Sequence, residues 1–547
     1  MKRNRRSDSF VLAVLGLFIL LTATKASAIP AFARLYGTSC ATCHNPFPKL
    51  NDFGRAFKDN GFKFPVSDEE VLKVKALLLG APAQKEQFPN SIWPGTIPGM
   101  PPIGLRMNMF FQTVGKNRNN FRFVPTGTVP SVPSFVPRTD FESGLFSIFT
   151  AGNFGSDIAF WLDDDISVGG ANANGGLGDA YLKFVNIGRL IKLPKDSLGL
   201  RIGQFELDIP FSQARSYNIS PYDIYTESNV GAMATALPQS QQFVNNVFGL
   251  ADASQGFELS GGHSYGGYHY SIAVVNQNSS GHAAGSDFVP SATGGNNGGL
   301  GFLSDSNFKD VYGRFSYRFN LERDKASRTG IQAAGTLGPR THTFINLGTY
   351  YFYGRSMQQL IGQEASGTPT LITANEPFYR AGADFNFNYR KFNIYGLYMR
   401  GHDRNLLPID NTGVVIPLPP SGAPPLPVGF IHARDAEFDG GFIQADYMVF
   451  PWMLTLMRYD AVNSSADRIN GLTLNTGTPF FGPFSDTRNR FTPGVQFLIH
   501  ANIKTSFEYQ IRPKQQILNG VDPLTGTLHN VSPFRTNTFT AGLEWVY

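Results

Sequence analysis

The feature that most constrains the fold is an alternation of apolar and polar residues, with a period of two, in short segments along most of the chain. Examples are ADFNFNYR at 383–390, VYGRFSYRFN at 311–320 and IKTSFEYQI at 503–511. Such a period places apolar side chains on one face of a β-strand and polar side chains on the other. Here the apolar face is rich in Phe and Tyr and the polar face carries charges. This combination is typical of a transmembrane β-barrel with lipid outside and a wet lumen, whereas a soluble sandwich would turn its apolar face inward.

The number of such segments also favours a barrel. We expect sixteen antiparallel strands, an even number as in bacterial single-chain barrels, and their ranges are 104–115, 141–153, 156–168, 177–187, 197–206, 254–263, 266–277, 308–320, 340–353, 379–389, 390–402, 436–449, 450–462, 489–500, 501–513 and 536–547. Tight turns such as YRKF and FPWM alternate with long loops such as 207–253 and 403–435. This alternation predicts short turns and both termini on the periplasmic side. The C-terminal TAGLEWVY has the aromatic ending of outer-membrane barrel strands, and no later segment is apolar enough for a spanning helix.

The N-terminus has the parts of a secretory signal peptide. A basic head is followed by an apolar run, Phe10–Thr22, and by an A-x-A ending at Ala28, after which we expect cleavage. The alternative is a membrane anchor, but the run is shorter than the roughly 20 apolar residues that span a bilayer. Residues 1–28 carry most of the formal net charge of +5. The mature chain is therefore nearly neutral, and no basic patch indicates a nucleic-acid partner.

The two cysteines of the chain, Cys40 and Cys43, are followed directly by His44. In an exported protein this C-x-x-C-H spacing allows a redox disulfide, a zinc site or a covalent haem c. A redox disulfide would call for a βαβ pattern, and a zinc site would need further ligands, but the next histidine is His263. We therefore predict one covalent haem c, with Cys40 and Cys43 as the attachment cysteines and His44 as an axial ligand of the haem iron.

The residues after the motif predict a small α-helical haem domain at 29–80. One helix is expected over Pro48–Asn60, with Phe53 and Phe57 on one face, and a second from Ser67 to Leu79, because Ser67 and Glu70 form a capping box. A Pro- and Gly-rich linker at 81–103 then leads to the barrel at 104–547. Met100, in the sequence IPGMPP, is a candidate distal ligand of the haem iron, and a plain linker residue is the alternative.

At this point the chain resembles the fused monohaem cytochrome–porins of the outer membranes of iron-oxidising bacteria and their relatives. The residues that carry the resemblance are Cys40, Cys43, His44 and FPKLNDFGRAFKDNGF at 47–62. The resemblance implies a location in the bacterial outer membrane, in contact with its lipid. It also implies electron transfer from extracellular Fe(II) to a periplasmic soluble cytochrome or other redox carrier, and thus a possible Fe(II) oxidase. From the barrel size we expect residues 29–100 to lie in or under the lumen.

Three other functions stay open at this stage. The same conduit would serve outward transfer to external acceptors, a diffusion porin would use the haem domain as a plug, and a haem peroxidase would need a distal acid–base group that the local sequence does not offer. Asp163, Asp164 and Asp165 are a candidate cation site, with a solvated strand end as the alternative. His402 and Asp403 are a further candidate. The segment Gly203–Asn229 favours a loop folded into the pore, with a surface loop as the alternative.

Overall fold

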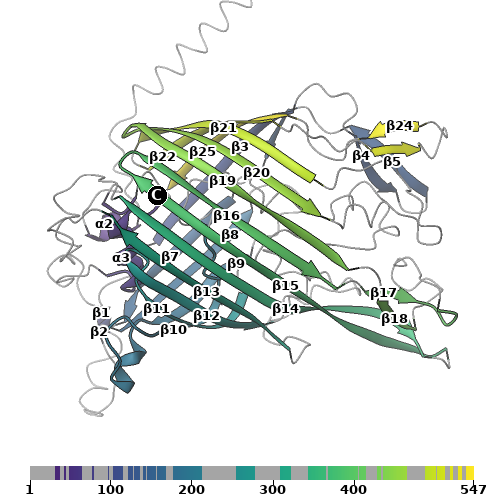
Figure 1. Ribbon diagram of the computed structural model, residues 1–547, viewed down its shortest axis with the longest axis horizontal. Helices are drawn as coiled ribbons and strands as arrows, with labels where there is room; N and C mark the ends of the chain where they lie inside the picture. The colour runs from purple at the N-terminus through teal and green to yellow at the C-terminus, as the bar shows by residue number, and fades with distance from the viewer. Residues whose placement is uncertain are drawn as a thin grey trace, which may run out of the picture.

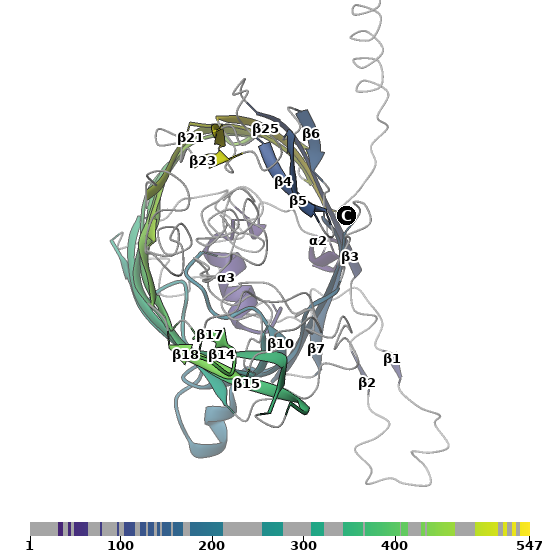
Figure 2. The same cartoon turned by 90° about the vertical axis from the view of Figure 1, so that its right-hand side faces the viewer.

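The protein is a closed antiparallel β-barrel (Figures 1 and 2). In the computed structural model, the described residues are 31–36, 42–44, 49–63, 77–78, 96–97, 103–114, 121–126, 129–135, 139–142, 145–154, 157–167, 176–211, 254–276, 308–321, 343–364, 367–404, 406–413, 428–432, 435–464, 487–500, 502–511, 518–521, 528–531 and 537–546. The strands of the wall are β3 (Ile103–Val114), β6 (Thr139–Glu142), β7 (Leu145–Phe154), β8 (Ile158–Ser167), β9 (Gly176–Phe184), β10 (Gly199–Phe205), β11 (Ser254–Gly262), β12 (Gly267–Asn276), β13 (Lys309–Asn320), β14 (Phe344–Gln363), β15 (Pro369–Tyr389), β16 (Phe392–Asp403), β19 (Ala436–Phe450), β20 (Met453–Ser464), β21 (Thr487–His500), β22 (Ile503–Gln510) and β25 (Thr538–Val546).

These elements form sixteen strand positions. Strands β6 and β7 both pair with β3, β6 along residues 110–113 and β7 along residues 103–107, so together they make one strand of the wall. Strand β25 pairs with β3 and closes the ring. Each of the sixteen predicted segments coincides with one of these positions, and the predicted barrel is confirmed.

The wall has the orientation that the alternation predicts. Along β13, Val311, Phe315 and Tyr317 are exposed on the outer face, whereas Arg314 and Arg318 are buried on the lumen face. A soluble β-protein would bury the aromatic face instead. The outer face of the barrel is therefore suited to lipid, which cannot hydrogen-bond to polar groups.

The longest strands exceed their predicted ranges. We predicted segments at 340–353 and 379–389, but β14 reaches Gln363 and β15 begins at Pro369, and the two remain paired throughout. Figure 1 shows this hairpin extending beyond the rest of the wall. Outside the membrane the two faces of a strand no longer meet different solvents, so the period-two pattern that marks the strand is lost.

Four small hairpins and three helical elements complete the described structure. The hairpins are β1 (Leu77–Leu78) with β2 (Thr96–Ile97), β4 (Phe121–Thr126) with β5 (Val129–Phe135), β17 (Leu406–Ile409) with β18 (Gly429–His432), and β23 (Leu518–Val521) with β24 (Leu528–Val531); the helices are α2 (Ala31–Tyr36), α3 (Asp52–Asp59) and the 3₁₀ helix η2 (Ile187–Ile191). None of the described helices combines the length and apolar character needed to cross a membrane.

The N-terminal segment differs in part from its prediction. Helix α3 confirms the expected helix over Pro48–Asn60, although it begins four residues later, and α2 was not predicted. The second predicted helix, Ser67–Leu79, is wrong at Leu77 and Leu78, which pair as a strand with Ile97 and Thr96. Short apolar runs such as VLKVKALLL do not distinguish helix from strand by period alone. The rest of that predicted helix lies outside the described residues.

The orientation of the wall predicts the effect of a charge on its outer face. Phe315, near the middle of β13, is 50% exposed on that face. We expect Phe315→Arg to lower the free energy of unfolding of the barrel in lipid vesicles by about 2–4 kcal/mol, because a guanidinium at the bilayer midplane loses its hydration. Urea unfolding followed by tryptophan fluorescence measures the change. Phe315→Leu is the matched control, and equal stability of the two variants would contradict an outer face in lipid.

Candidate functional site in the barrel lumen

The segment that carries the C-x-x-C-H motif lies inside the barrel. In Figure 2, which looks along the barrel, helix α3 lies within the ring of strands and α2 lies next to the wall. Figure 1 places both helices at one end of the barrel, where the tight turns join the strands. For residues 31–63, as far as they are described, this agrees with the expectation that residues 29–100 lie in or under the lumen.

Helix α3 forms because its first turn is capped and one face is apolar. The Asn51 side-chain oxygen accepts a hydrogen bond from the N–H of Gly54 at 2.9 Å, which satisfies one free donor at the helix start. Phe53, Ala56 and Phe57 are buried on one side. Charged residues occupy the remaining sides of the helix. Asp52 and Asp59 of the helix, and Lys49 just before it, make the polar contacts to the wall that are described next.

Helix α3 is held to the wall by an ion pair to a strand and by hydrogen bonds to the turn between β11 and β12. Arg318 of β13 is 2.8 Å from the Asp52 carboxylate. At the other end of the helix, the N–H and the hydroxyl of Ser264 donate hydrogen bonds to the Asp59 carboxylate at 3.1 Å and 2.7 Å. Because Arg318 is 2% exposed, its charge has little access to water and depends on Asp52.

Lys49, just before the helix, reaches a different part of the wall. Its ammonium donates a hydrogen bond to the Asn393 side chain and lies 3.9 Å from the Asp446 carboxylate. Burial lowers the pKa of Lys49 to about 8, and the opposing effect of Asp446 offsets only part of this. Lys49 is therefore still charged at neutral pH, where burial of its ammonium costs stability, and this cost is relieved as the pH rises from about 8 toward the ordinary pKa of 10.5.

Aromatic contacts fix the other side of the segment. Phe32 and Tyr36 of α2 pack on Phe57 with ring centroids 5.1 Å and 5.5 Å apart. Phe62 in turn lies 5.4 Å from the Trp161 ring of β8. Gly61 has a φ of +73°, and a Cβ there would lie 2.8 Å from Val185. The chain thus turns sharply where it contacts the wall, at a position that only glycine fills without a clash.

The motif itself lies directly beside the start of α3. The N–H of Asn51 donates to the Cys43 carbonyl at 2.8 Å, and the Asn51 side-chain amide donates to the Thr42 carbonyl at 2.9 Å. A Cβ at Gly54 would come within 2.3 Å of the Cys43 carbonyl oxygen. Cys43 and His44 are half-buried. A thiol and an imidazole are therefore adjacent in the part of the chain that is held in the lumen, residues 31–63, here called the seated segment. Cys40 and Met100 lie outside the described residues.

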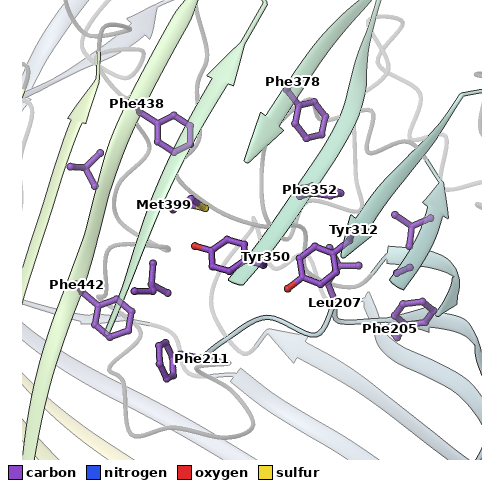
Figure 3. Close-up of a cluster of buried hydrophobic side chains, with 14 of the residues drawn as sticks. Phe205, Leu207, Phe211, Tyr312, Tyr350, Phe352, Phe378, Met399, Phe438 and Phe442 are labelled. Carbon is purple, nitrogen blue, oxygen red and sulfur yellow. The ribbon is translucent and has the colours of Figure 1, made fainter. Parts of the chain in front are cut away.

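Part of the lumen is filled by apolar side chains. Figure 3 shows this cluster, whose residues come from wall strands between β9 and β20 and from residues 206–211, here called the strap. The strap leaves β10 and crosses the lumen, and the Phe211 ring packs on Tyr395 of β16 and Phe442 of β19, with centroids 5.1 Å and 5.6 Å apart. For residues 206–211 the expectation of an infolded loop within Gly203–Asn229 is confirmed, and this part of the expected wet lumen is filled by apolar side chains.

The strap is also held by a polar clasp at Asp208. Its carboxylate lies 3.0 Å from the His269 ring and 3.8 Å from the Arg314 guanidinium, and its carbonyl accepts the Tyr312 hydroxyl at 2.7 Å. Burial alone would raise the pKa of Asp208, but the His269 ring and Arg314 hold it well below its usual range. The carboxylate is therefore charged at neutral pH and links the strap to strands β12 and β13.

The opposite side of the lumen is polar. On β19 to β22, β25 and β3, here called the polar wall, buried ion pairs line the lumen face, although β19 and β20 also contribute Phe438, Phe442 and Val462 to the apolar cluster. Asp460 accepts from Arg458 and Arg490, both at 3.1 Å. Glu544 lies 2.7 Å from both Lys504 and Arg106.

The other candidate sites from the sequence do not assemble. Asp163 is buried and accepts from the Trp161 ring N–H at 3.1 Å, while Asp164 follows it on the opposite face of the strand. Asp403 faces Arg380 at 2.8 Å, whereas His402 lies 3.3 Å from Asp435. Within the described ranges, no three His, Cys, Asp or Glu side chains come together as a metal site.

Several residues that shape the lumen were not singled out from the sequence. Asp52, Arg318, Asp208 and Asp446 read only as polar positions, because their partners are distant in the chain. The run TYYFYG at 349–354 was a usable signal: it is apolar on both faces of a strand and so predicts that the lumen face is covered.

Comparisons with known proteins give likenesses in fold to solved outer-membrane barrels, porins among them. No protein-family model matches the sequence, and no curated protein sequence matches it. The solved structures with similar folds include OmpT of Vibrio cholerae (8% identity, TM-score 0.39, covering 82% of this chain and 97% of that one), OprB of Pseudomonas putida (10%, 0.41, 82% and 94%) and an anion-selective porin of Comamonas acidovorans (10%, 0.40, 81% and 98%). With TM-scores this low, the assignment of the barrel rests on its own strand pairing.

The ion pair to α3 leads to a prediction about the seated segment. Asp52→Asn keeps the size of the side chain but removes the negative charge that lies 2.8 Å from buried Arg318, which we expect to weaken the attachment of α3 to the wall by about 1.5–3 kcal/mol. Limited proteolysis should then cut within residues 31–63 faster than in the unmodified protein, with the barrel intact. Glu437→Gln, which removes an exposed carboxylate on the outer face, should leave the cleavage rate unchanged. Equal cleavage of the Asp52→Asn variant and the unmodified protein would contradict a seat held by this pair.

The clasp leads to a second prediction, about conductance. Asp208→Asn removes the charge that His269 and Arg314 bind, so we expect the strap to leave the lumen more often and the single-channel conductance in planar bilayers to rise above that of the unmodified protein. Asp196→Asn, in the turn between β9 and β10, is the control with the same loss of charge. A conductance of the Asp208→Asn variant equal to that of the control would show that the strap does not limit passage.

Proposed function

We propose that this chain is an outer-membrane electron-transfer protein that carries one covalent haem c in the lumen of its barrel. The observation that carries the proposal is the seat of the motif: Cys43 and His44 adjoin a helix that Arg318, Ser264 and Lys49 fasten inside the barrel. An extracellular electron donor and a periplasmic carrier are separated by about 30 Å of hydrocarbon. A redox group within the lumen shortens that distance for both.

The residues present fit this cofactor. Cys40 and Cys43 would form the thioethers, His44 would offer its imidazole to the iron, and Met100 is the candidate for the opposite side. The motif adjoins the start of α3, and Phe57 of that helix belongs to an aromatic cluster with Phe32, Tyr36 and Phe62. Apolar walls of this kind suit a large planar group. When bound, haem c supplies reversible one-electron chemistry.

The residues of this chain hold the motif at one end of the lumen and limit the access of water and solutes to it. The ion pairs of Asp52 and Lys49 and the bonds of Asp59 keep the motif at the end of the lumen where the tight turns lie, which we assign to the periplasmic side. The strap limits the space through which water and solutes pass to that end. In the favoured direction, extracellular Fe(II) is oxidised to Fe(III) and one electron reaches a periplasmic soluble cytochrome or other redox carrier. The reverse direction, to an external acceptor, uses the same parts.

A second candidate function is a diffusion porin in which the N-terminal domain is a plug. The polar wall favours it, because hydrated ion pairs line the channels of porins. The strap and the seated helix favour the electron-transfer function, because both occupy the cross-section of the lumen. Conductance separates the two: a porin conducts with the strap in place, whereas an electron-transfer protein need not.

The function is tested by the optical spectrum of the purified, oxidised full-length protein in detergent. We expect c-type absorption bands, covalently retained after denaturation, and the appearance of the reduced bands when Fe(II) is added at acidic or neutral pH. Replacement of both Cys40 and Cys43 by Ala, which removes both attachment thiols, should lose the covalent haem while the barrel still folds. If dithionite reduces the protein but Fe(II) does not, iron is excluded as the donor; absence of any c-type band would overturn the proposal.

A further inference from the structure

Glu508 is a buried carboxylate of the polar wall that makes no ion pair or side-chain hydrogen bond with the described residues. It lies on the lumen face of β22 and is 3% exposed. Neither of its carboxylate oxygens has a hydrogen-bond partner in the part of the chain that the structure describes. A buried carboxylate in this position is costly unless a proton or a cation neutralises it.

The cations of the polar wall contact other carboxylates. Arg458 and Arg490 bind Asp460, and Lys504 and Arg106 bind Glu544, at 2.7–3.1 Å. Lys49 approaches Asp446 instead. Among the described ion pairs, none includes Glu508, so the wall supplies no direct counter-charge for it.

Several buried oxygen atoms lie at positions next to Glu508 on the lumen face. Strand register places Thr540 opposite Glu508 on one side and Gly494 on the other. Thr492 and Gln496 flank Gly494 on the same face. The hydroxyl oxygens of Thr540 and Thr492 and the amide oxygen of Gln496 are buried and, like Glu508, have no hydrogen-bond partner among the described residues. Five unpartnered oxygen atoms thus gather on four neighbouring side chains.

Gly494 keeps room for this arrangement. A Cβ at that position would lie 3.0 Å from the Glu508 Cγ and 3.0 Å from a Leu456 methyl group. The Glu508 side chain therefore extends over the glycine. Across the strands, Gly494 is paired with Leu456 of β20, and Leu456 with Asp446 of β19. Any side chain at position 494 would push Glu508 away from Thr492 and Gln496.

We propose that Glu508, Thr540, Thr492 and Gln496 bind a hydrated divalent metal cation on the polar wall of the lumen. Oxygen atoms are the ligands that hard cations such as Mg²⁺ and Mn²⁺ prefer, and one carboxylate with neutral oxygens leaves several coordination positions to water. Such a cation neutralises Glu508 and accounts for the unpartnered acceptors together. The site is independent of the haem and is filled or empty whatever the direction of electron transfer.

The test uses Mn²⁺ and the full-length protein in detergent. Free hydrated Mn²⁺ gives a sharp six-line electron paramagnetic resonance signal that weakens when the ion binds, so a titration yields the affinity. We expect binding to the unmodified protein and at least a roughly tenfold loss of affinity in Glu508→Gln. Gly494→Ala keeps every ligand but displaces Glu508, so it should also weaken binding. Glu437→Gln, on the outer face, should bind as the unmodified protein does.

Two results would overturn the proposal. One is the absence of Mn²⁺ binding at millimolar concentrations, or equal affinity in the unmodified protein and in Glu508→Gln. The other is an infrared carbonyl band of a protonated carboxylic acid that persists with excess Mn²⁺ and disappears in Glu508→Gln, because a proton would then neutralise Glu508 in place of a cation. Folded barrel content, followed by the gel mobility of unheated samples, ensures that each variant is compared in its folded form.

Discussion

Strands β25 and β3 pair along their lengths, from Thr538 opposite Val114 to Val546 opposite Arg106, and the rest of the structure depends on this pairing. It joins the last strand of the wall to the first, so that among the described strands the wall is a closed ring with no edge strand. In lipid an unpaired N–H or C=O has no water to bind and costs several kcal/mol. Closure is therefore the condition under which an aromatic outer face such as that of β13 can lie in a membrane.

Closure also creates an interior with two different sides. On one side the strap and the aromatic residues around Tyr395 and Phe442 pack like the core of a soluble domain. On the other side charges are paired across neighbouring strands, as at Asp460 and Glu544. Lys49, from the seated segment, reaches the polar side, while Phe62 packs on Trp161 of the wall. The segment with the motif is therefore fixed by both kinds of contact, and the proposed function follows from that position.

Much of the wall could be predicted because lipid imposes a simple rule on every strand. Residues 311–320 and 383–390 show the alternation directly, and even weakly marked strands such as β10 fall at the predicted places. The rule ends where the lipid ends, so the extension of β14 and β15 was missed. Leu77 and Leu78 were assigned to a helix because a short apolar run carries no clear period. Helix α3 was predictable because its cap and its apolar face are local.

The sequence by itself determined the barrel, its strand number, and the chemistry that the C-x-x-C-H motif makes possible, since these depend on alternation and spacing within short stretches. Only the tertiary structure decided that Asp52 meets Arg318, that Phe211 reaches Tyr395, and that Glu508 has no counter-charge beside it. Each of these depends on residues far apart in the chain that closure of the ring brings together. A polar residue on a strand is predictable from its neighbours, but its partner across the lumen is not.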